Sequence, residues 1–333
     1  MLTNLLPKIT VIIPVLNCGD MLERAIESVL AQRYENLELI IMDGGSADNS
    51  IDIIKRYAHY IAYWSSEQDG SSNVAINRGI EKATGELIAS LMADDWYEPG
   101  TLLKVGQALR RHPEADIISC GGRIIYREKH SQHYQLRSIF TSPRALSLSF
   151  PSICFGASAI CCRFIRRSLY ARIGHYLPAD AAGRHIFSAD KEFLLRAVLC
   201  QAVNITIDHL GYTYYEHANS ATFDGNNYTR LARICGEHLE TAANYLKRAD
   251  LSQGQRYFLH YWFNDQSTRL LLYSLLTKRF RVAAETAIAG IQKYNLLWPI
   301  AFCLTVCKIF IKKLSRFFYK IVIVTNRDAN NHV

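Results

Sequence analysis

The chain has 333 residues, of which 49% are hydrophobic and 20% are charged. This length exceeds what one ordinary core needs, so we expect one main domain with an added module. The net charge of +8 favours an anionic partner, such as a nucleotide phosphate, a nucleic acid or an anionic membrane surface. Nine cysteines without a CxxC pair or a zinc-finger spacing indicate reduced thiols, as found in the cytoplasm.

Apolar strands alternate with amphipathic helices over the first hundred residues. This order predicts a doubly wound, mostly parallel sheet with flanking helices. The expected strands are residues 9–15, 37–42, 61–66 and 87–92, and the expected helices are residues 21–33, 51–58 and 73–83.

The middle of the chain continues as an α/β pattern, and everything beyond residue 228 has the pattern of helices. Residues 129–141 are polar, and we expect a loop there. Helices are expected at 101–111 and 187–200, with strands at 116–120, 123–126, 204–208 and 211–215.

The last forty residues differ in character from the rest. Residues 296–307 are nearly all apolar but too short to cross a bilayer, which takes about 20 residues. Basic side chains then recur every fourth residue from Lys308 to Lys320, with apolar side chains on the other face. This pattern predicts a basic amphipathic helix. It either contacts an anionic membrane surface or packs on its own domain with a solvated basic side.

Two adjacent carboxylates, Asp94 and Asp95, directly follow the apolar strand at 87–92. Open α/β sheets bind ligands at the carboxyl ends of their strands. Two carboxylates there are costly unless something positive neutralises them, and a divalent cation that bridges to a phosphate does so. The alternative is that one aspartate merely caps the turn at Trp96.

Six short motifs stand in one order along the chain. Together they resemble the family 2 inverting glycosyltransferases, which have the GT-A fold. The resemblance is strong over the first hundred residues and reaches Ser220 weakly. The motifs are residues 12–17, 42–50, 66–70, 77–80, 83–86 and 93–96.

The resemblance implies the transfer of a sugar, of the hexosyltransferase class, from a nucleotide-diphosphate sugar. A UDP-sugar is the expected donor, and the acceptor is a hydroxyl of a glycan or a polyprenyl-linked lipid. Such enzymes serve cell-surface polysaccharide assembly. We therefore expect a cytoplasmic protein held peripherally at the inner face of the plasma membrane by its C-terminal helix, with no nucleic acid as partner.

The resemblance also assigns residues to the donor. Asp43 accepts the imide N–H of the base beside Pro14 and Val15, although an Asx turn over Gly44 is an equally physical role for it. Met92 stands where the family often has Asp or Asn, so a polar group is missing from the ribose site. The expected donor-binding residues are Pro14, Val15, Asn17, Asp43, Glu67, Asn77 and Asp94.

For the chemistry, the resemblance gives Asp95 to a metal, Mn²⁺ or Mg²⁺, and Asp94 to the nucleotide. His217 is a further candidate metal ligand, or else a hydrogen-bonded structural residue. Inversion needs a general base for the acceptor hydroxyl. Asp190, at the start of the helix at 187–200, is the expected base, with Glu192 as the alternative and a helix cap as the structural role.

The expected organisation is a GT-A domain over residues 1–228, followed by a helical region over residues 229–333 that ends in the basic tail. Residues 1–100 form the nucleotide-sugar half of the GT-A domain, and residues 101–228 form the acceptor half.

Other classes of protein fit the sequence less well. A nucleotidyltransferase shares the sheet and the metal carboxylates, but its Gly-rich activating loop is missing after the first strand. A dehydrogenase needs G-x-G-x-x-G at that point. A non-catalytic sugar-nucleotide-binding protein with the same fold would not need to retain Asp43, Asp94, Asp95 and Asp190. In a nucleic-acid binder, the basic residues would not be concentrated in the tail.

Overall fold

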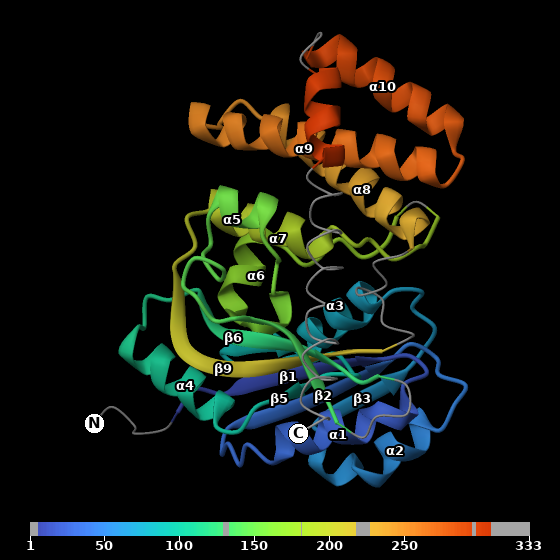
Figure 1. Cartoon of the computed structure of the whole chain (residues 1–333). Coiled ribbons are helices and arrows are strands. Elements are labelled where there is room, and N and C mark those ends of the chain that lie inside the picture. Colours follow the sequence, from blue (N-terminus) through green and yellow to red (C-terminus); the bar gives the residue numbers. More distant parts are fainter. Residues whose placement is uncertain (1–5, 129–132, 181, 218–226, 295–297, 308–333) are drawn as a thin grey trace, which may run out of the picture. The chain divides into compact units, whose positions relative to one another are not determined.

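The computed structural model describes residues 6–128, 133–180, 182–217, 227–294 and 298–307 (Figure 1). The chain divides into two compact units, Met1–Asp224 and Gly225–Val333. The sequence analysis sets this division after residue 228. Its separation of a nucleotide-sugar half from an acceptor half stays a prediction.

The first unit contains a sheet with the strand order β3-β2-β1-β4-β8-β6-β9-β5, and β7 pairs with β6. The first four of these strands are parallel, as predicted. Helices cover both faces of this part, and its strands are therefore continuous apolar runs without alternation. The bounds are β1 Ile9–Val15, β2 Leu37–Asp43, β3 Tyr63–Ser66 and β4 Leu87–Ser90.

The helices of this half lie on opposite sides of the sheet. Figure 1 shows α1 and α2 below the strands and α3 above them. Val11 and Ile13 of β1 pack in one cluster with Leu22 and Ile26 of α1, whereas Ile12 points to Gly79 of α3. The chain changes sides because β2 and β4 flank β1 on opposite edges. The helices are α1 Gly19–Leu30, α2 Ser50–Arg56, the short η1 Ala58–Tyr60 and α3 Ser72–Lys82.

The second half of the sheet is mixed. β8 joins β4 and β6 in antiparallel pairs, and β9 runs parallel to β6 but antiparallel to β5. The added elements are β5 Trp96–Tyr97, α4 Thr101–Arg111, β6 Ile117–Tyr126, β7 Gln135–Phe140, α5 Phe150–Phe155, η2 Ile160–Cys162, β8 Arg163–Arg166, α6 Arg167–Ile173, α7 Ala189–Leu199 and β9 Asn204–Glu216.

Three expectations for this half were wrong in detail. The strands predicted at 116–120 and 123–126 are one strand, β6, and those at 204–208 and 211–215 are one strand, β9. The two long strands pair with each other through shifts in register. The loop predicted at 129–141 contains strand β7. Most of β7 is exposed, so its sequence lacks the alternation that burial of one face produces.

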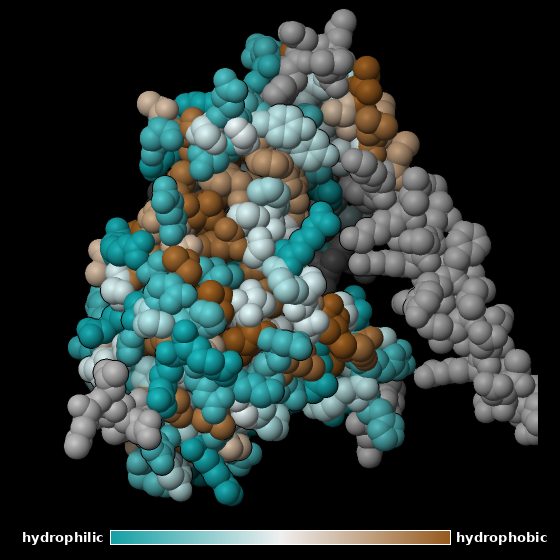
Figure 2. Space-filling view, turned by 90° about the vertical axis from the view of Figure 1, so that its left-hand side faces the viewer, coloured by the Kyte–Doolittle hydropathy of each residue, from teal (hydrophilic) through white to brown (hydrophobic). Residues whose placement is uncertain are grey.

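The second unit is helical over its described residues, as predicted. Helix α9 starts with a capping box between Ser252 and Gln255. Figure 2 shows hydrophobic side chains at its upper right, where the C-terminal helices lie. Among the described residues, no helix is both long and apolar enough to cross a bilayer. The predicted basic tail helix lies outside the described residues. The helices are α8 Tyr228–Leu246, α9 Gln253–Leu276, α10 Phe280–Tyr294 and a helix at 298–307.

A clamp of polar side chains joins the strands at their amino ends. Glu38 of β2 accepts hydrogen bonds from Lys8 (2.7 Å), Thr10 (2.6 Å) and Thr84 (2.6 and 2.7 Å). Burial raises the pKa of Glu38, but these hydrogen bonds outweigh it and lower the pKa to about 2.

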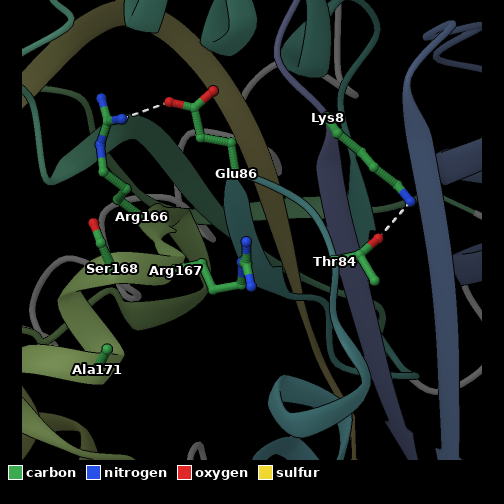
Figure 3. A pocket seen from close by; sticks show the side chains of 7 residues that line it. All are labelled: Lys8, Thr84, Glu86, Arg166, Arg167, Ser168 and Ala171. Carbon is green, nitrogen blue, oxygen red and sulfur yellow. Dashed lines mark hydrogen bonds and ion pairs between the residues drawn. The ribbon is translucent and has the colours of Figure 1, made fainter.

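Beside the clamp lies an open pocket of about 580 Å³ (Figure 3). Its Lys8 is paired with Glu38, and its Arg166 is paired with Glu86. These cations are therefore already neutralised by protein carboxylates. The pocket is lined by Lys8, Thr84, Glu86, Arg166, Arg167, Ser168 and Ala171.

Gly79→Ala should destabilise the first unit. A Cβ atom at Gly79 would lie 2.6 Å from Cγ2 of the fully buried Ile12. We expect a loss of about 1–2 kcal/mol, because overpacking outweighs the gain in helix propensity. Gly236→Ala in α8 is the matched control, since nothing lies within 4 Å of its Cβ position, and it should stabilise by up to about 1 kcal/mol. Urea unfolding of both variants checks this, and equal effects would contradict the contact with Ile12.

Glu38→Gln should lose stability in a pH-dependent way. The pKa of Glu38 is lower in the folded state than in the unfolded chain, so its ionised form stabilises the fold above pH 4.5, and this is lost as the pH falls towards 2. We expect the variant to unfold about 2–3 kcal/mol more easily at pH 7 and by a much smaller margin near pH 2. Unfolding curves across this range test the sign, and a pH-independent difference would refute it.

Candidate active site

The candidate site lies at the carboxyl ends of the neighbouring strands β1 and β4. The chain continues to β2 on one side of β1, whereas β4 lies on its other side, and ligands bind at such a switch in strand order. Asn17 follows β1 with a positive φ of 49°. Its N–H donates to Ser46 Oγ at 2.8 Å, and its Oδ1 accepts from the Ala47 N–H at 2.8 Å. Asn17 therefore fixes the turn after β2 against the end of β1.

Asp43 is fully buried at the end of β2 and uses both carboxylate oxygens within its surroundings. Oδ2 accepts from the N–H groups of Gly45 and Ser46, both at 3.0 Å, and from Ser66 Oγ at 2.6 Å. Oδ1 accepts from Ser46 Oγ at 2.5 Å. The Asx turn considered in the sequence analysis is present, and the contact with a base stays a prediction.

Pro14 and Val15 are buried and lie in register with Met42 and Asp43. Their expected place beneath a nucleotide base stays a prediction.

Two further donor-site candidates are held by other parts of the protein. Glu67 is two-thirds exposed and forms an ion pair of 2.9 Å with Arg78. The Asn77 amide donates to the carbonyl of Tyr176 at 2.8 Å and accepts from its N–H at 3.1 Å. Asn77 thereby ties α3 to the segment that precedes α7. Its expected contact with the donor would need these two hydrogen bonds to change.

The side chains of Asp94 and His217 are in contact although 123 positions separate them in the chain. Asp94 lies in the turn after β4, and His217 directly follows β9. His217 Nε2 is 2.9 Å from Asp94 Oδ2, and both side chains are partly exposed. A carboxylate oxygen and an imidazole nitrogen are thus placed side by side.

Asp95 has different surroundings. Its side chain is buried, Oδ2 accepts from the Tyr212 hydroxyl at 2.7 Å, and Oδ1 accepts from the Tyr215 N–H at 2.8 Å. The Met92 N–H donates to the same hydroxyl at 3.2 Å. Burial, and then the charge of Asp94, raise the pKa of Asp95 well above its usual value. Each carboxylate oxygen thus accepts one hydrogen bond from β9, and the expected role of Asp95 as metal ligand stays a prediction.

Arg24 of α1 holds the turn that carries Asp94. Its Nη2 donates to the Asp94 carbonyl at 2.9 Å, and its Nη1 donates to the Tyr134 hydroxyl at 3.0 Å. The guanidinium lies 3.9 Å from the ring centre of Trp96 and 5.0 Å from that of Tyr215. Such contacts contribute about 0.5–2 kcal/mol each. Arg24 thus positions the Asp94 turn against the end of β9.

The donor set at Asp94 and His217 fits a divalent cation in part. Among the described residues, no group of three or more His, Cys, Asp or Glu side chains is arranged to hold a metal. A cation here would take two ligands from the protein and the rest from phosphate oxygens and water, as Mg²⁺ and Mn²⁺ do at phosphate sites.

Asp190 is in the first turn of α7. Its Oδ1 accepts from the Lys191 N–H at 2.6 Å. Burial raises the pKa of Asp190, while the Lys191 charge and a hydrogen bond with Ser158 oppose the rise. A raised pKa strengthens a carboxylate as a base. Lys191 in turn donates to the carbonyls of Ile153 (2.5 Å) and Gly156 (2.7 Å), which anchors the adjoining loop.

The alternative base, Glu192, is engaged by Arg196. Arg196 Nε lies 3.0 Å from both Glu192 oxygens, and Nη2 lies 2.8 Å from Oε2. Arg196 also donates to the carbonyls of Ile173 and His175. Glu192 therefore serves to fix the segment before α7, which leaves Asp190 as the better candidate.

Sequence reasoning missed Arg24 and Tyr212, two residues that position the site. Trp96 directly after the two aspartates, and the tyrosines near the predicted strand at 211–215, were the only hints. Neither hint shows that Arg24 contacts Trp96 or that Tyr212 contacts Asp95, because these contacts depend on how β9 crosses the sheet.

Residues 10–174 match the family model described as Glycosyl transferase family 2. An uncharacterised glycosyltransferase of Rickettsia typhi is 31% identical over 169 residues, which cover 50% of this chain and 53% of that protein. The chain thus spans about half the length of this curated relative.

Two solved structures share the fold. One is a mannosyltransferase of Pyrobaculum calidifontis in complex with GDP-Man and Mn²⁺, with a TM-score of 0.58 at 17% identity over 95% of this chain and 84% of that one. The other is Staphylococcus aureus TarS 1–349 with UDP-GlcNAc, with a TM-score of 0.53 at 15% identity over 84% of this chain and 89% of that one.

The fold is therefore the GT-A class of α/β fold with an added helical region, which confirms the fold predicted from the sequence. The matched region, residues 10–174, is a glycosyl transferase family 2 domain.

Proposed function

We propose that this protein transfers a sugar, of the hexosyl class, from a nucleotide-diphosphate sugar to an acceptor hydroxyl, with inversion at the anomeric carbon. The observation that carries the proposal is the pair of Asp94 and His217, which lie 2.9 Å apart beyond the carboxyl end of β4. The nucleotide sugars bound by the two structural neighbours support a donor of this type. Among donors we propose a UDP-sugar, which follows from the resemblance of residues 12–17 and 42–50.

We propose Asp94 and His217 as the residues that hold a divalent cation, with Asp95 as the residue that positions them. This exchanges the roles that the sequence suggested for the two aspartates. The partial exposure of Asp94 and the complete engagement of Asp95 support the exchange. Bound there, Mn²⁺ or Mg²⁺ would neutralise charge that develops on the departing diphosphate. The imidazole nitrogen favours Mn²⁺, because Mg²⁺ prefers oxygen ligands.

Asp190 is the proposed general base. An in-line displacement needs a carboxylate that removes the proton of the acceptor hydroxyl as the hydroxyl attacks. Lys191 and Ser158 orient the carboxylate, while burial keeps it basic. The backbone N–H of Lys191 holds Oδ1 of the carboxylate at 2.6 Å.

The proposed acceptor is a glycan or a polyprenyl-linked lipid used in surface polysaccharide assembly. The basic, apolar C-terminal region supports a peripheral place at the inner face of the plasma membrane, where such acceptors are found. The first unit carries the candidate active site, and the second unit is proposed to hold the protein at the membrane where the acceptor lies.

Asp94→Asn should weaken Mn²⁺ binding in the presence of UDP by about tenfold or more, with little change in the unfolding midpoint. His217→Ala should act alike. Asp95→Asn should instead lower the free energy of unfolding by about 1–3 kcal/mol, because the amide keeps one acceptor oxygen and either the Tyr212 hydroxyl or the Tyr215 N–H loses its buried acceptor. Titration of Mn²⁺ followed by electron paramagnetic resonance, together with urea unfolding, separates the two effects. If Asp95→Asn loses Mn²⁺ binding but keeps the wild-type stability, Asp95 is the metal ligand after all.

Asp190→Asn should lower kcat by about 10²–10⁴-fold while donor affinity stays nearly constant. In the wild type, kcat should fall as the pH drops through the pKa of Asp190, which burial places above the usual 3.8. Sugar transfer and UDP binding measured between pH 4 and 8 check both statements. If Asp190→Asn loses donor affinity as strongly as it loses kcat, Asp190 is not the base.

A further inference from the structure

The charge of this protein is unevenly distributed along the chain. Residues 278–333 carry ten Lys and Arg against two Asp and Glu, and residues 1–277 carry 28 of each. The whole net charge of +8 therefore belongs to the last part of the chain. A charge concentrated in this way marks a surface that meets an anionic partner.

The described part of this region begins with a basic turn between α9 and α10. Lys278 has a positive φ of 58°, and the N–H of Arg279 donates to the Ser274 carbonyl at 2.8 Å, which ends α9. Phe280 follows with 66% of its surface exposed, and Arg281 is exposed next to it. A large apolar side chain thus stands in solvent beside Lys278 and Arg279, while Arg281 pairs with Glu285 at 2.9 Å.

Exposed apolar side chains continue along the next two helices. On α10, Ile288 is 56% exposed and Ile291 is 43% exposed. On the helix at 298–307, Ile300 is 58% exposed and Leu304 is 56% exposed. With Phe280 they define what we call the outer face: Phe280, Ile288, Ile291, Ile300 and Leu304.

The outer face is not needed to hold these helices together. They contact each other through their other sides, where Ala283 and Trp298 are buried with Leu271 of α9. At Gly290 a Cβ would lie 2.2 Å from Cε2 of Trp298, so the two helices touch almost backbone to ring. The fold is satisfied on the inner side, and the exposed apolar residues are free for a partner.

We propose that the outer face and the basic turn lie on an anionic lipid bilayer, with the apolar side chains in the interfacial layer and the cations at the headgroups. This rests on the proposed peripheral membrane association. It assigns the contact to α10 and the helix at 298–307. No described helix is long and apolar enough to span, so the mode is one that lies in the interface.

Charge decides between a lipid surface and the other possible occupants. A second copy of the chain would bring two strongly positive surfaces together in a symmetric contact, which like charges oppose. Residues 308–333 carry six Lys and Arg against one Asp, so they would meet Lys278, Arg279 and Arg281 with the same sign. An anionic bilayer satisfies both the apolar and the basic components.

Sedimentation of the full-length protein with vesicles tests the proposal. Vesicles of equimolar phosphatidylglycerol and phosphatidylcholine should bind the protein, and vesicles of phosphatidylcholine alone should bind it far more weakly. Phe280→Ser with Ile288→Ser should lower partition to the anionic vesicles by about tenfold or more at unchanged net charge. The matched control is Leu103→Ser with Leu136→Ser, two residues of the first unit that are 43% and 56% exposed, and it should bind like the wild type.

A second variant tests the contribution of charge. The double substitution Arg279→Glu with Arg281→Glu should also weaken binding to the anionic vesicles, and added salt should weaken binding of the wild type. All variants should keep the wild-type unfolding midpoint and its transfer rate to a water-soluble acceptor. Equal binding of the Phe280/Ile288 variant and the wild type would overturn the proposal. The proposal would also be overturned if sedimentation velocity showed that the wild type is a dimer and the Phe280/Ile288 variant is a monomer. A wild type without transferase activity that still binds vesicles would refute the proposed function and leave this inference standing.

Discussion

The candidate site depends on one buried carboxylate. Asp95 accepts hydrogen bonds from the Tyr212 hydroxyl and the Tyr215 N–H, and it thereby joins the end of β9 to the turn after β4. His217 follows two residues after Tyr215, so this junction sets its distance from Asp94. Removing either hydrogen bond would leave a buried polar group unsatisfied, which makes the junction rigid.

The two adjacent aspartates therefore differ in their burial and in their partners. Asp95 is buried and engaged, and its burial is repaid by hydrogen bonds from tyrosines. Asp94 is partly exposed beside His217, with its backbone held by Arg24. Asp190 occupies a third kind of setting, in which burial raises its pKa while Lys191 and Ser158 orient it. Three carboxylates of similar chemistry thus acquire different properties from their surroundings alone.

Much of the first half of the fold was predictable. Strands such as β1 and β2 are continuous apolar runs because both of their faces are covered, and the turns after them are rich in Gly and Asx residues. Strand β7 was not predictable, because it is an exposed edge strand without alternating burial. The joining of two predicted segments into β9 was also hidden, since a shift in register at Gly211 looks like a break in the sequence.

For the site, local sequence specified which residue types stand at the ends of strands: Asp43 after β2, and Asp94 and Asp95 after β4. It also carried the family motifs and the concentration of charge in residues 278–333. The division of roles between Asp94 and Asp95 came from contacts with Tyr212, Tyr215 and His217, more than a hundred residues away. Burial and partners set the properties of a carboxylate, and both depend on how distant segments pack, which spacing along one chain does not encode.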